Sequence, residues 1–179
     1  MTLVLSLTSI SLFAASMAQA QCCGGMTAGS SCPMSTPASA GIAATSATKQ
    51  PILAEPAQSV FDGYTRIQTG LAQDSFATVQ DNAVNLVKSL QGDSAKALPA
   101  ALSEQALALA NAKDLASARE AFKPLSRSLI DFLKAQNLPA GAYYEVYCPM
   151  ADASWVQTDK TVANPYFGKA MLHCGQIKS

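Results

Sequence analysis

The chain has 179 residues, of which 49% are hydrophobic and only 13% are charged, and its formal net charge is zero. A chain with this charge balance offers no basic surface for nucleic acid and no electrostatic attraction to a membrane surface. Its length allows one domain together with a leader and a tail. We therefore expect one small domain that has no nucleic-acid partner.

Residues 1–20 have the pattern of a secretory signal peptide. An apolar run extends from Leu3 to Ala15, and Ala18-Gln19-Ala20 is a small-x-small cleavage pattern. Because the run is too short for a comfortable membrane span, we expect export with cleavage after Ala20 and no membrane span in the mature chain. A retained N-terminal anchor is the main alternative.

Residues 21–57 form a predicted flexible tail and linker. The segment is rich in Gly, Ser, Thr, Ala and Pro, has no charge before Lys49, and cannot bury enough apolar surface to offset the entropy lost on ordering. It nevertheless concentrates sulfur, which makes it a candidate second metal site. The alternative is a leader remnant whose cysteines form adventitious disulfides. The sulfur residues of this tail are Cys22, Cys23, Met26, Cys32 and Met34.

Residues 58–136 repeat apolar side chains at helical spacing in four stretches, which predicts four amphipathic helices. Asp74 or Ser75 is a plausible N-cap of the second helix, Gly92 ends it, and Pro124 predicts a kink within the fourth. The first three stretches are Val60, Phe61, Tyr64, Ile67 and Leu71; then Phe76, Val79, Ala83, Leu86 and Leu90; then about Leu102 to Ala112. The fourth stretch contains Leu115, Ala118, Phe122, Leu125, Leu129 and Phe132.

The predicted fold class is all-α, an antiparallel four-helix bundle that occupies residues 58–179 together with its C-terminal segment. Leu138-Pro139-Ala140-Gly141 breaks the helical pattern. Residues 143–147 are then predicted to be a short extended segment, and the chain from there to Ser179 to be irregular and packed on the helices. This C-terminal segment carries the candidate chemistry.

Four sulfur residues of the C-terminal segment are the candidate metal ligands. Cys148 and Met150 are two apart, which places both side chains on one face of an extended segment. Met171 and Cys174 are three apart, which suits one turn of helix. Thiolates and thioethers are soft donors that select copper(I), silver(I) and related ions. His173 adjoins Cys174 and could join such a site if the backbone there is irregular.

The principal alternative to a metal site is a Cys148–Cys174 disulfide. Paired cysteines of an exported protein form disulfides by default, and this one would close a loop of about 26 residues and stabilise the fold by roughly 3 kcal/mol. The mature chain would hold five cysteines, so at least one lacks an internal partner. Trp155 and Tyr166 are expected to be packing residues.

The order of these motifs resembles a known family. The resemblance is carried by the segment 118–126 of the fourth helix, by Tyr147-Cys148-Pro149-Met150-Ala151, by Trp155, and by the run from Asn164-Pro165-Tyr166-Phe167-Gly168 to Met171-Leu172-His173-Cys174-Gly175. The family is a small helical domain of exported bacterial proteins, formerly a domain of unknown function, which also occurs at the C-terminus of CusB-type periplasmic adaptors of copper/silver efflux systems. The resemblance covers about residues 58–178.

The resemblance implies a periplasmic protein that binds copper(I) or silver(I) through Cys148, Met150, Met171 and Cys174, with His173 less firmly implied. The chain lacks the other domains of an adaptor, so we expect a free metal buffer or carrier whose partner is an efflux component or a metallochaperone. The rival function is a structural or interaction module held by the Cys148–Cys174 disulfide. An enzyme is not expected, because the chain has a single histidine and no zinc-site or phosphate-loop spacing.

Overall fold

The computed structural model describes residues 52–178, which belong to the unit Ser46–Ser179. The predicted signal peptide, the tail as far as Pro51 and the candidate tail ligands Cys22, Cys23, Met26, Cys32 and Met34 lie outside the described residues. Within residues 52–178, none of the helices is both long enough and apolar enough to cross a membrane.

The four predicted helices are present, and each turns its apolar stripe inward. They are α1 (Ala57–Ala72), α2 (Phe76–Gln91), α3 (Ala101–Ala110) and α4 (Leu115–Ala135). Ser75 is the N-cap residue of α2 and Gly92 its C-cap residue, as the sequence predicts. The third helix ends two residues before the predicted Ala112. Most of the periodic apolar residues are buried, and Phe76, Leu115 and Phe132 are partly buried against them.

Helix α4 begins with a capping box that the sequence reading did not identify. The Asp114 carboxylate accepts the Ser117 backbone N–H at 2.7 Å, and the Ser117 hydroxyl oxygen accepts the Asp114 backbone N–H at 3.2 Å. Two backbone donors that the first turn leaves unpaired are thereby satisfied. Pro124 lies inside this helix, as predicted.

The prediction of an all-α fold is wrong in one respect, because the C-terminal segment forms a small antiparallel sheet. Its strands are β1 (Tyr144–Cys148), β2 (Ala153–Gln157) and β3 (Gln176–Ile177), in the order β2-β1-β3. The predicted extended segment corresponds to β1. The other two strands escaped prediction because β3 has only two residues and β2 buries consecutive side chains, so neither shows the period of two that marks a strand.

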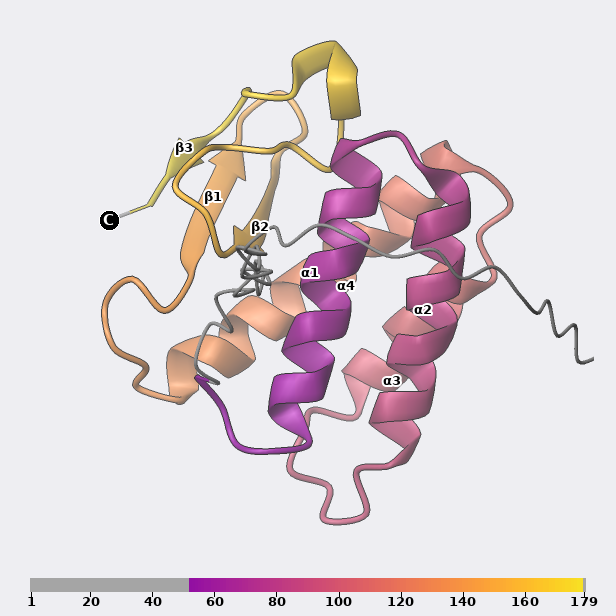
Figure 1. Cartoon of the computed structure of the whole chain (residues 1–179), viewed down its shortest axis with the longest axis vertical. Coiled ribbons are helices and arrows are strands. Elements are labelled where there is room, and N and C mark those ends of the chain that lie inside the picture. The colour runs from indigo at the N-terminus through magenta and orange to yellow at the C-terminus, as the bar shows by residue number, and fades with distance from the viewer. Residues whose placement is uncertain (1–51, 179) are drawn as a thin grey trace, which may run out of the picture. The chain divides into compact units, whose positions relative to one another are not determined.

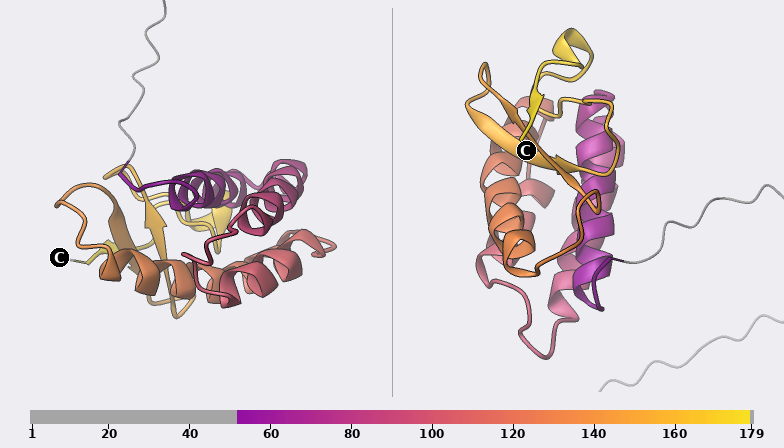
Figure 2. Two further views of the ribbon diagram at one scale, coloured as in Figure 1. Left: turned by 90° about the horizontal axis from the view of Figure 1, so that it is seen from below. Right: turned by 90° about the vertical axis from the view of Figure 1, so that its left-hand side faces the viewer.

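The helices follow one another around a shared core, and the sheet occupies the side between the first and the last helix (Figures 1 and 2). Each helix packs on the next along the chain, while β2 packs on both α4 and α1. The 3₁₀ turn Gly168–Met171 between β2 and β3 contacts α1. The described part is therefore mostly helical, with the sheet as one wall of its core.

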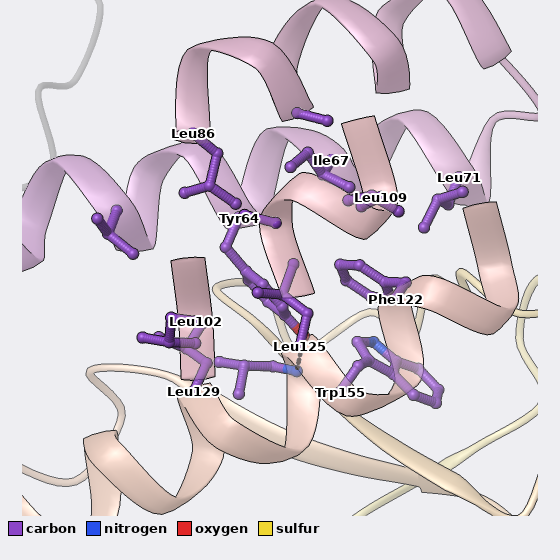
Figure 3. Close-up of a cluster of buried hydrophobic side chains, with 14 of the residues drawn as sticks. Tyr64, Ile67, Leu71, Leu86, Leu102, Leu109, Phe122, Leu125, Leu129 and Trp155 are labelled. Atoms are coloured by element: carbon purple, nitrogen blue, oxygen red, sulfur yellow. Dashed lines mark hydrogen bonds between the residues drawn. The ribbon is translucent and has the colours of Figure 1, made fainter. Parts of the chain in front are cut away.

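Three rings and one hydroxyl join the sheet to the helices (Figure 3). The Tyr64 ring stacks on Phe122 at 4.9 Å between centroids, so α1 and α4 meet through large side chains. The Tyr64 hydroxyl lies 2.8 Å from the Ser126 hydroxyl on α4 and accepts the backbone N–H of Val156 on β2 at 3.1 Å. Trp155 is wholly buried beside them. A single phenol therefore connects three elements.

Replacing Tyr64 with phenylalanine should lower the free energy of unfolding by about 1–3 kcal/mol, because it leaves the buried Ser126 hydroxyl and Val156 N–H without their shared partner. Urea unfolding followed by far-ultraviolet circular dichroism measures this change. Tyr144→Phe is the matched control, since the Tyr144 hydroxyl makes no hydrogen bond within residues 52–178. Equal stabilities of the two variants would contradict the role given to the Tyr64 hydroxyl.

Candidate metal centre

Cys148 and Cys174 come together although 26 residues separate them in the chain. Cys148 is the last residue of β1, and Cys174 lies just before β3. Strand β3 pairs with β1 through Tyr147 and Gln176, which brings the residues flanking this pair together. The two Sγ atoms are 3.4 Å apart, and both thiols are free. The antiparallel pairing of β1 with β3 thus creates a dithiol at the end of the sheet.

The two thiols differ in exposure. Cys148 is wholly buried, and Cys174 is partly buried at the edge of the core. Gly175 explains how the chain next to Cys174 can approach so closely. A Cβ atom at that position would lie 2.6 Å from the Trp155 ring and 2.9 Å from a Val146 methyl group, so a larger residue would displace the segment.

Hydrogen-bond donors surround the sulfur of Cys148. Burial by itself would raise the pKa of this thiol, but the backbone N–H of Ala151 and the Cys174 thiol oppose it. The Asn164 side chain and the backbone N–H of Met150 act in the same direction, and the net result is a Cys148 pKa below that of an ordinary cysteine. The turn that follows β1 therefore favours the thiolate.

The partner thiol has the opposite tendency. Cys174 donates its hydrogen bond to the Cys148 sulfur, which favours the protonated form, and desolvation and the charge of Cys148 add to this, so the pKa of Cys174 is raised. The two thiols are therefore not equivalent, because Cys148 ionises more readily than Cys174. The pair offers two soft donors, of which Cys148 loses its proton first.

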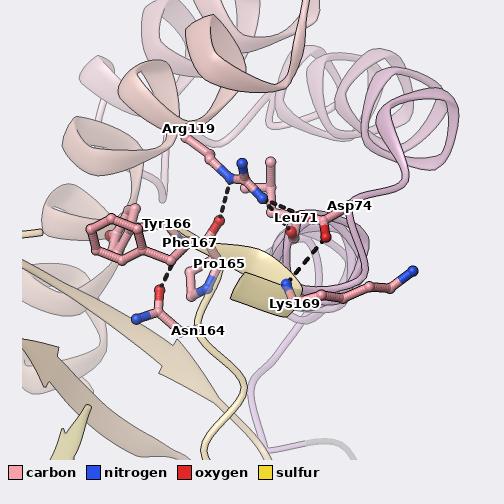
Figure 4. Close-up of polar contacts among 8 residues, drawn as sticks. All are labelled: Leu71, Asp74, Arg119, Asn164, Pro165, Tyr166, Phe167 and Lys169. Atoms are coloured by element: carbon pink, nitrogen blue, oxygen red, sulfur yellow. Dashed lines mark hydrogen bonds and ion pairs between the residues drawn. The ribbon is translucent and has the colours of Figure 1, made fainter. Parts of the chain in front are cut away.

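An ion pair on the helices anchors the segment that carries Cys174 (Figure 4). Arg119 on α4 donates to the Pro165 carbonyl at 3.0 Å and pairs with Asp74 at 2.5 Å. Asp74 also accepts the backbone N–H of Lys169 at 3.1 Å. The loop before Cys174 is therefore tied to α4 and to the connection between α1 and α2.

The remaining predicted ligands lie in different surroundings. Met150 follows Cys148 in the turn between β1 and β2, and it is 67% exposed, whereas Cys148 is buried. Met171 ends the 3₁₀ turn, is partly buried, and its carbonyl accepts the Cys174 N–H at 3.0 Å. His173 is exposed, and its Nδ1 lies 2.8 Å from the Val162 carbonyl oxygen. Met150 does not share the burial of Cys148, because β1 ends at Cys148 and the alternation of faces ends with it.

No three side chains of the types His, Cys, Asp and Glu gather within residues 52–178 in a way that could hold a metal ion. Among donors of these four types, the structure brings Cys148 and Cys174 together. The sequence does not indicate the groups around them, and it marks Asn164 only as part of the motif Asn164-Pro165-Tyr166-Phe167-Gly168. An asparagine directly before a proline is typical of a turn, and this turn signal was the available clue.

Four helices with a small sheet and a thiol pair at its end define a mostly helical domain with a dithiol centre. Residues 60–141 of the chain match a family described as "Protein of unknown function (DUF3347)". The match spans the helices and ends before β1, so Cys148 and Cys174 lie beyond the matched residues. No curated protein and no solved structure matches the chain.

The asymmetry of the thiol pair can be measured in the protein that carries serine at positions 22, 23 and 32 and keeps both Cys148 and Cys174, because each thiol shifts the pKa of the other. Alkylation rates against pH, followed at each site by mass spectrometry, give one titration for each thiol. The midpoint for Cys148 should lie below that of an ordinary cysteine. The midpoint for Cys174 should lie above that of Cys148. The reverse order would contradict the assignment of Cys148 as the thiol that ionises first.

Proposed function

We propose that the chain binds one soft monovalent ion, copper(I) or silver(I), between Cys148 and Cys174, and that it acts as a periplasmic buffer or carrier of that ion. The observation that carries the proposal is the 3.4 Å separation of two thiol sulfurs that come from distant parts of the chain. The metal is cargo, and the role is binding, without catalysis. An antiparallel helical bundle would serve as the rigid support of the site.

The distance between the sulfurs suits a shared ion. In thiolate sites for zinc the metal–sulfur distance is about 2.3 Å, so two sulfurs on one ion of that size can lie at most about 4.6 Å apart. The observed 3.4 Å falls within this limit. A small movement of the Cys174 side chain, which is only partly buried, can then adjust the coordination angle.

The charge of the pair favours a monovalent ion. Hydrogen-bond donors lower the pKa of Cys148, so loss of this one proton on metal binding would supply one negative charge, which a monovalent cation neutralises. A divalent cation would leave an uncompensated buried charge unless the second thiol also ionised, which its raised pKa opposes. Soft thiolate donors add the preference for copper(I) and silver(I) over hard cations.

The neighbouring sulfurs receive separate roles in this proposal. Met171 is partly buried one turn before Cys174 and is the candidate third donor. Met150, exposed beside the site, is placed to meet an ion that arrives from a periplasmic efflux component or a metallochaperone. His173 is exposed, and the hydrogen bond between its Nδ1 and the Val162 carbonyl leaves Nε2 as the nitrogen that could coordinate an ion. The tail sulfurs remain a proposed second site.

Copper(I) titration of the reduced protein, under anaerobic conditions with a chromogenic chelator as competitor, tests this proposal. Removal of an outer-shell partner weakens metal sites 10- to 100-fold, so loss of a ligand in Cys148→Ser or Cys174→Ser should weaken binding by more than about 100-fold. Met150→Leu should change affinity by less than about 3-fold, because the exposed thioether is outside the pair. The starting protein carries serine at positions 22, 23 and 32.

Absence of binding tighter than about 1 μM in that protein would remove the proposal. Equal losses of copper(I) affinity in Met150→Leu and Cys148→Ser would instead indicate that Met150 is a ligand as important as Cys148. Met171→Leu tests the third donor. Its copper(I) affinity should fall by more than in Met150→Leu and by less than in Cys148→Ser.

The same separation of the sulfurs favours a second function, a domain stabilised by a Cys148–Cys174 disulfide. Closing the bond requires the sulfurs to approach from 3.4 Å to about 2.05 Å. In this alternative the bond fastens the C-terminal segment, and the module supports the structure of a larger assembly or an interaction with another protein.

Mass spectrometry after rapid alkylation distinguishes the two functions. Protein from the exported fraction should accept alkyl groups at both Cys148 and Cys174 if the pair is kept reduced for metal. A mass two protons lower that resists alkylation and does not change when copper is added would support the disulfide module and contradict the metal carrier.

A further inference from the structure

Asn164 is a wholly buried amide that contacts both segments of the dithiol centre. Its side-chain N–H donates to the Cys174 carbonyl oxygen at 2.6 Å. The same side chain also lowers the pKa of Cys148 as a hydrogen-bonding neighbour of its thiol. An amide nitrogen carries two hydrogens, so it can serve both partners at once. One side chain therefore links the end of β1 to the residue before Gly175.

The side-chain oxygen and the backbone N–H of Asn164 are also held by hydrogen bonds. Its side-chain oxygen accepts the backbone N–H of Tyr166 at 2.8 Å and that of Phe167 at 3.3 Å. Its backbone N–H donates to the Leu172 carbonyl at 2.7 Å. The amide thus has fixed neighbours on its oxygen side and faces the two cysteines with its nitrogen side (Figure 4 shows the oxygen side).

We propose that Asn164 is a positioning residue that sets the separation of the Cys148 and Cys174 thiols. The inference deepens the proposed function, on which it rests, by naming the residue that preorganises the dithiol before any ion arrives. Neither cysteine is held to the other by a covalent bond, and the short strand β3 pairs with only two residues of β1. The amide supplies the additional constraint that brings the Cys174 segment against Cys148.

The test is Asn164→Asp, which retains the oxygen that accepts the Tyr166 and Phe167 N–H groups. It replaces the donating nitrogen with an oxygen that repels the Cys174 carbonyl and the Cys148 thiolate. The matched control is Gln157→Glu. Gln157 is also a buried amide whose nitrogen donates to loop carbonyls, those of Asp159 and Thr161, and within residues 52–178 it makes no hydrogen bond with either thiol.

The first measurement needs no metal. Each protein, with serine at positions 22, 23 and 32, is equilibrated with reduced and oxidised glutathione. Two protein thiols and one glutathione disulfide give one protein disulfide and two glutathione thiols, so the two electrons and two protons removed from the protein appear on glutathione. The equilibrium constant reports the effective concentration of one thiol at the other. It should fall about 10-fold in Asn164→Asp, which loses a hydrogen bond to the Cys174 segment, and change little in Gln157→Glu.

The second measurement is copper(I) affinity, which should fall in parallel in Asn164→Asp. If no variant binds copper(I) while the glutathione equilibrium still shifts, the proposed function fails and the role of Asn164 stands. If Asn164→Asp behaves as Gln157→Glu does in both measurements, Asn164 has no positioning role. Should Asn164→Asp not fold, Asn164→Ser provides the same comparison, because a hydroxyl can accept within the turn but is too short to reach Cys174.

Discussion

The structure depends on how the sheet is attached to the helices, and the Tyr64 hydroxyl makes that attachment. Strand β2 lies at one edge of the sheet, where backbone groups have no strand partner. The Tyr64 oxygen accepts the Val156 N–H at this edge and pairs with Ser126 on α4. Buried polar groups must find partners. With the β1–β2 hairpin in this position, the Tyr64 hydroxyl, the Ser126 hydroxyl and the Val156 N–H are hydrogen-bonded to one another.

The dithiol centre has two separate supports. Cys148 is held from the sheet side, because β1 pairs with β2 and Tyr64 anchors β2. Cys174 is held from the helix side, because Arg119 and Asp74 fasten the loop that leads to it. Asn164 lies where these two supports meet. A site assembled from two independently anchored segments can be rigid without a covalent link, which is what a reversible metal site requires.

The proposed metal carrier and the proposed disulfide module use the same pair of atoms in different redox states. Hydrogen-bond donors around the Cys148 sulfur stabilise its anion, and an anionic sulfur is both the metal ligand and the reactive species in thiol–disulfide exchange. A bound ion would stabilise the folded chain by linkage and would occupy the thiolate. The redox state of the pair in the cell therefore decides between the two functions.

Local patterns in the sequence were sufficient for the helices and insufficient for the site. A helix is encoded by residues three and four apart, so the stripe from Leu115 to Leu129 and the cap before Phe76 could be predicted from neighbouring residues alone. The sheet depends on pairing between segments far apart in the chain, which local periodicity does not contain. For the same reason the spacing of Cys148 and Met150 suggested a shared face, whereas the tertiary structure ends the strand at Cys148 and exposes Met150. The meeting of Cys148 with Cys174 through Asn164 was decided only by the folded chain.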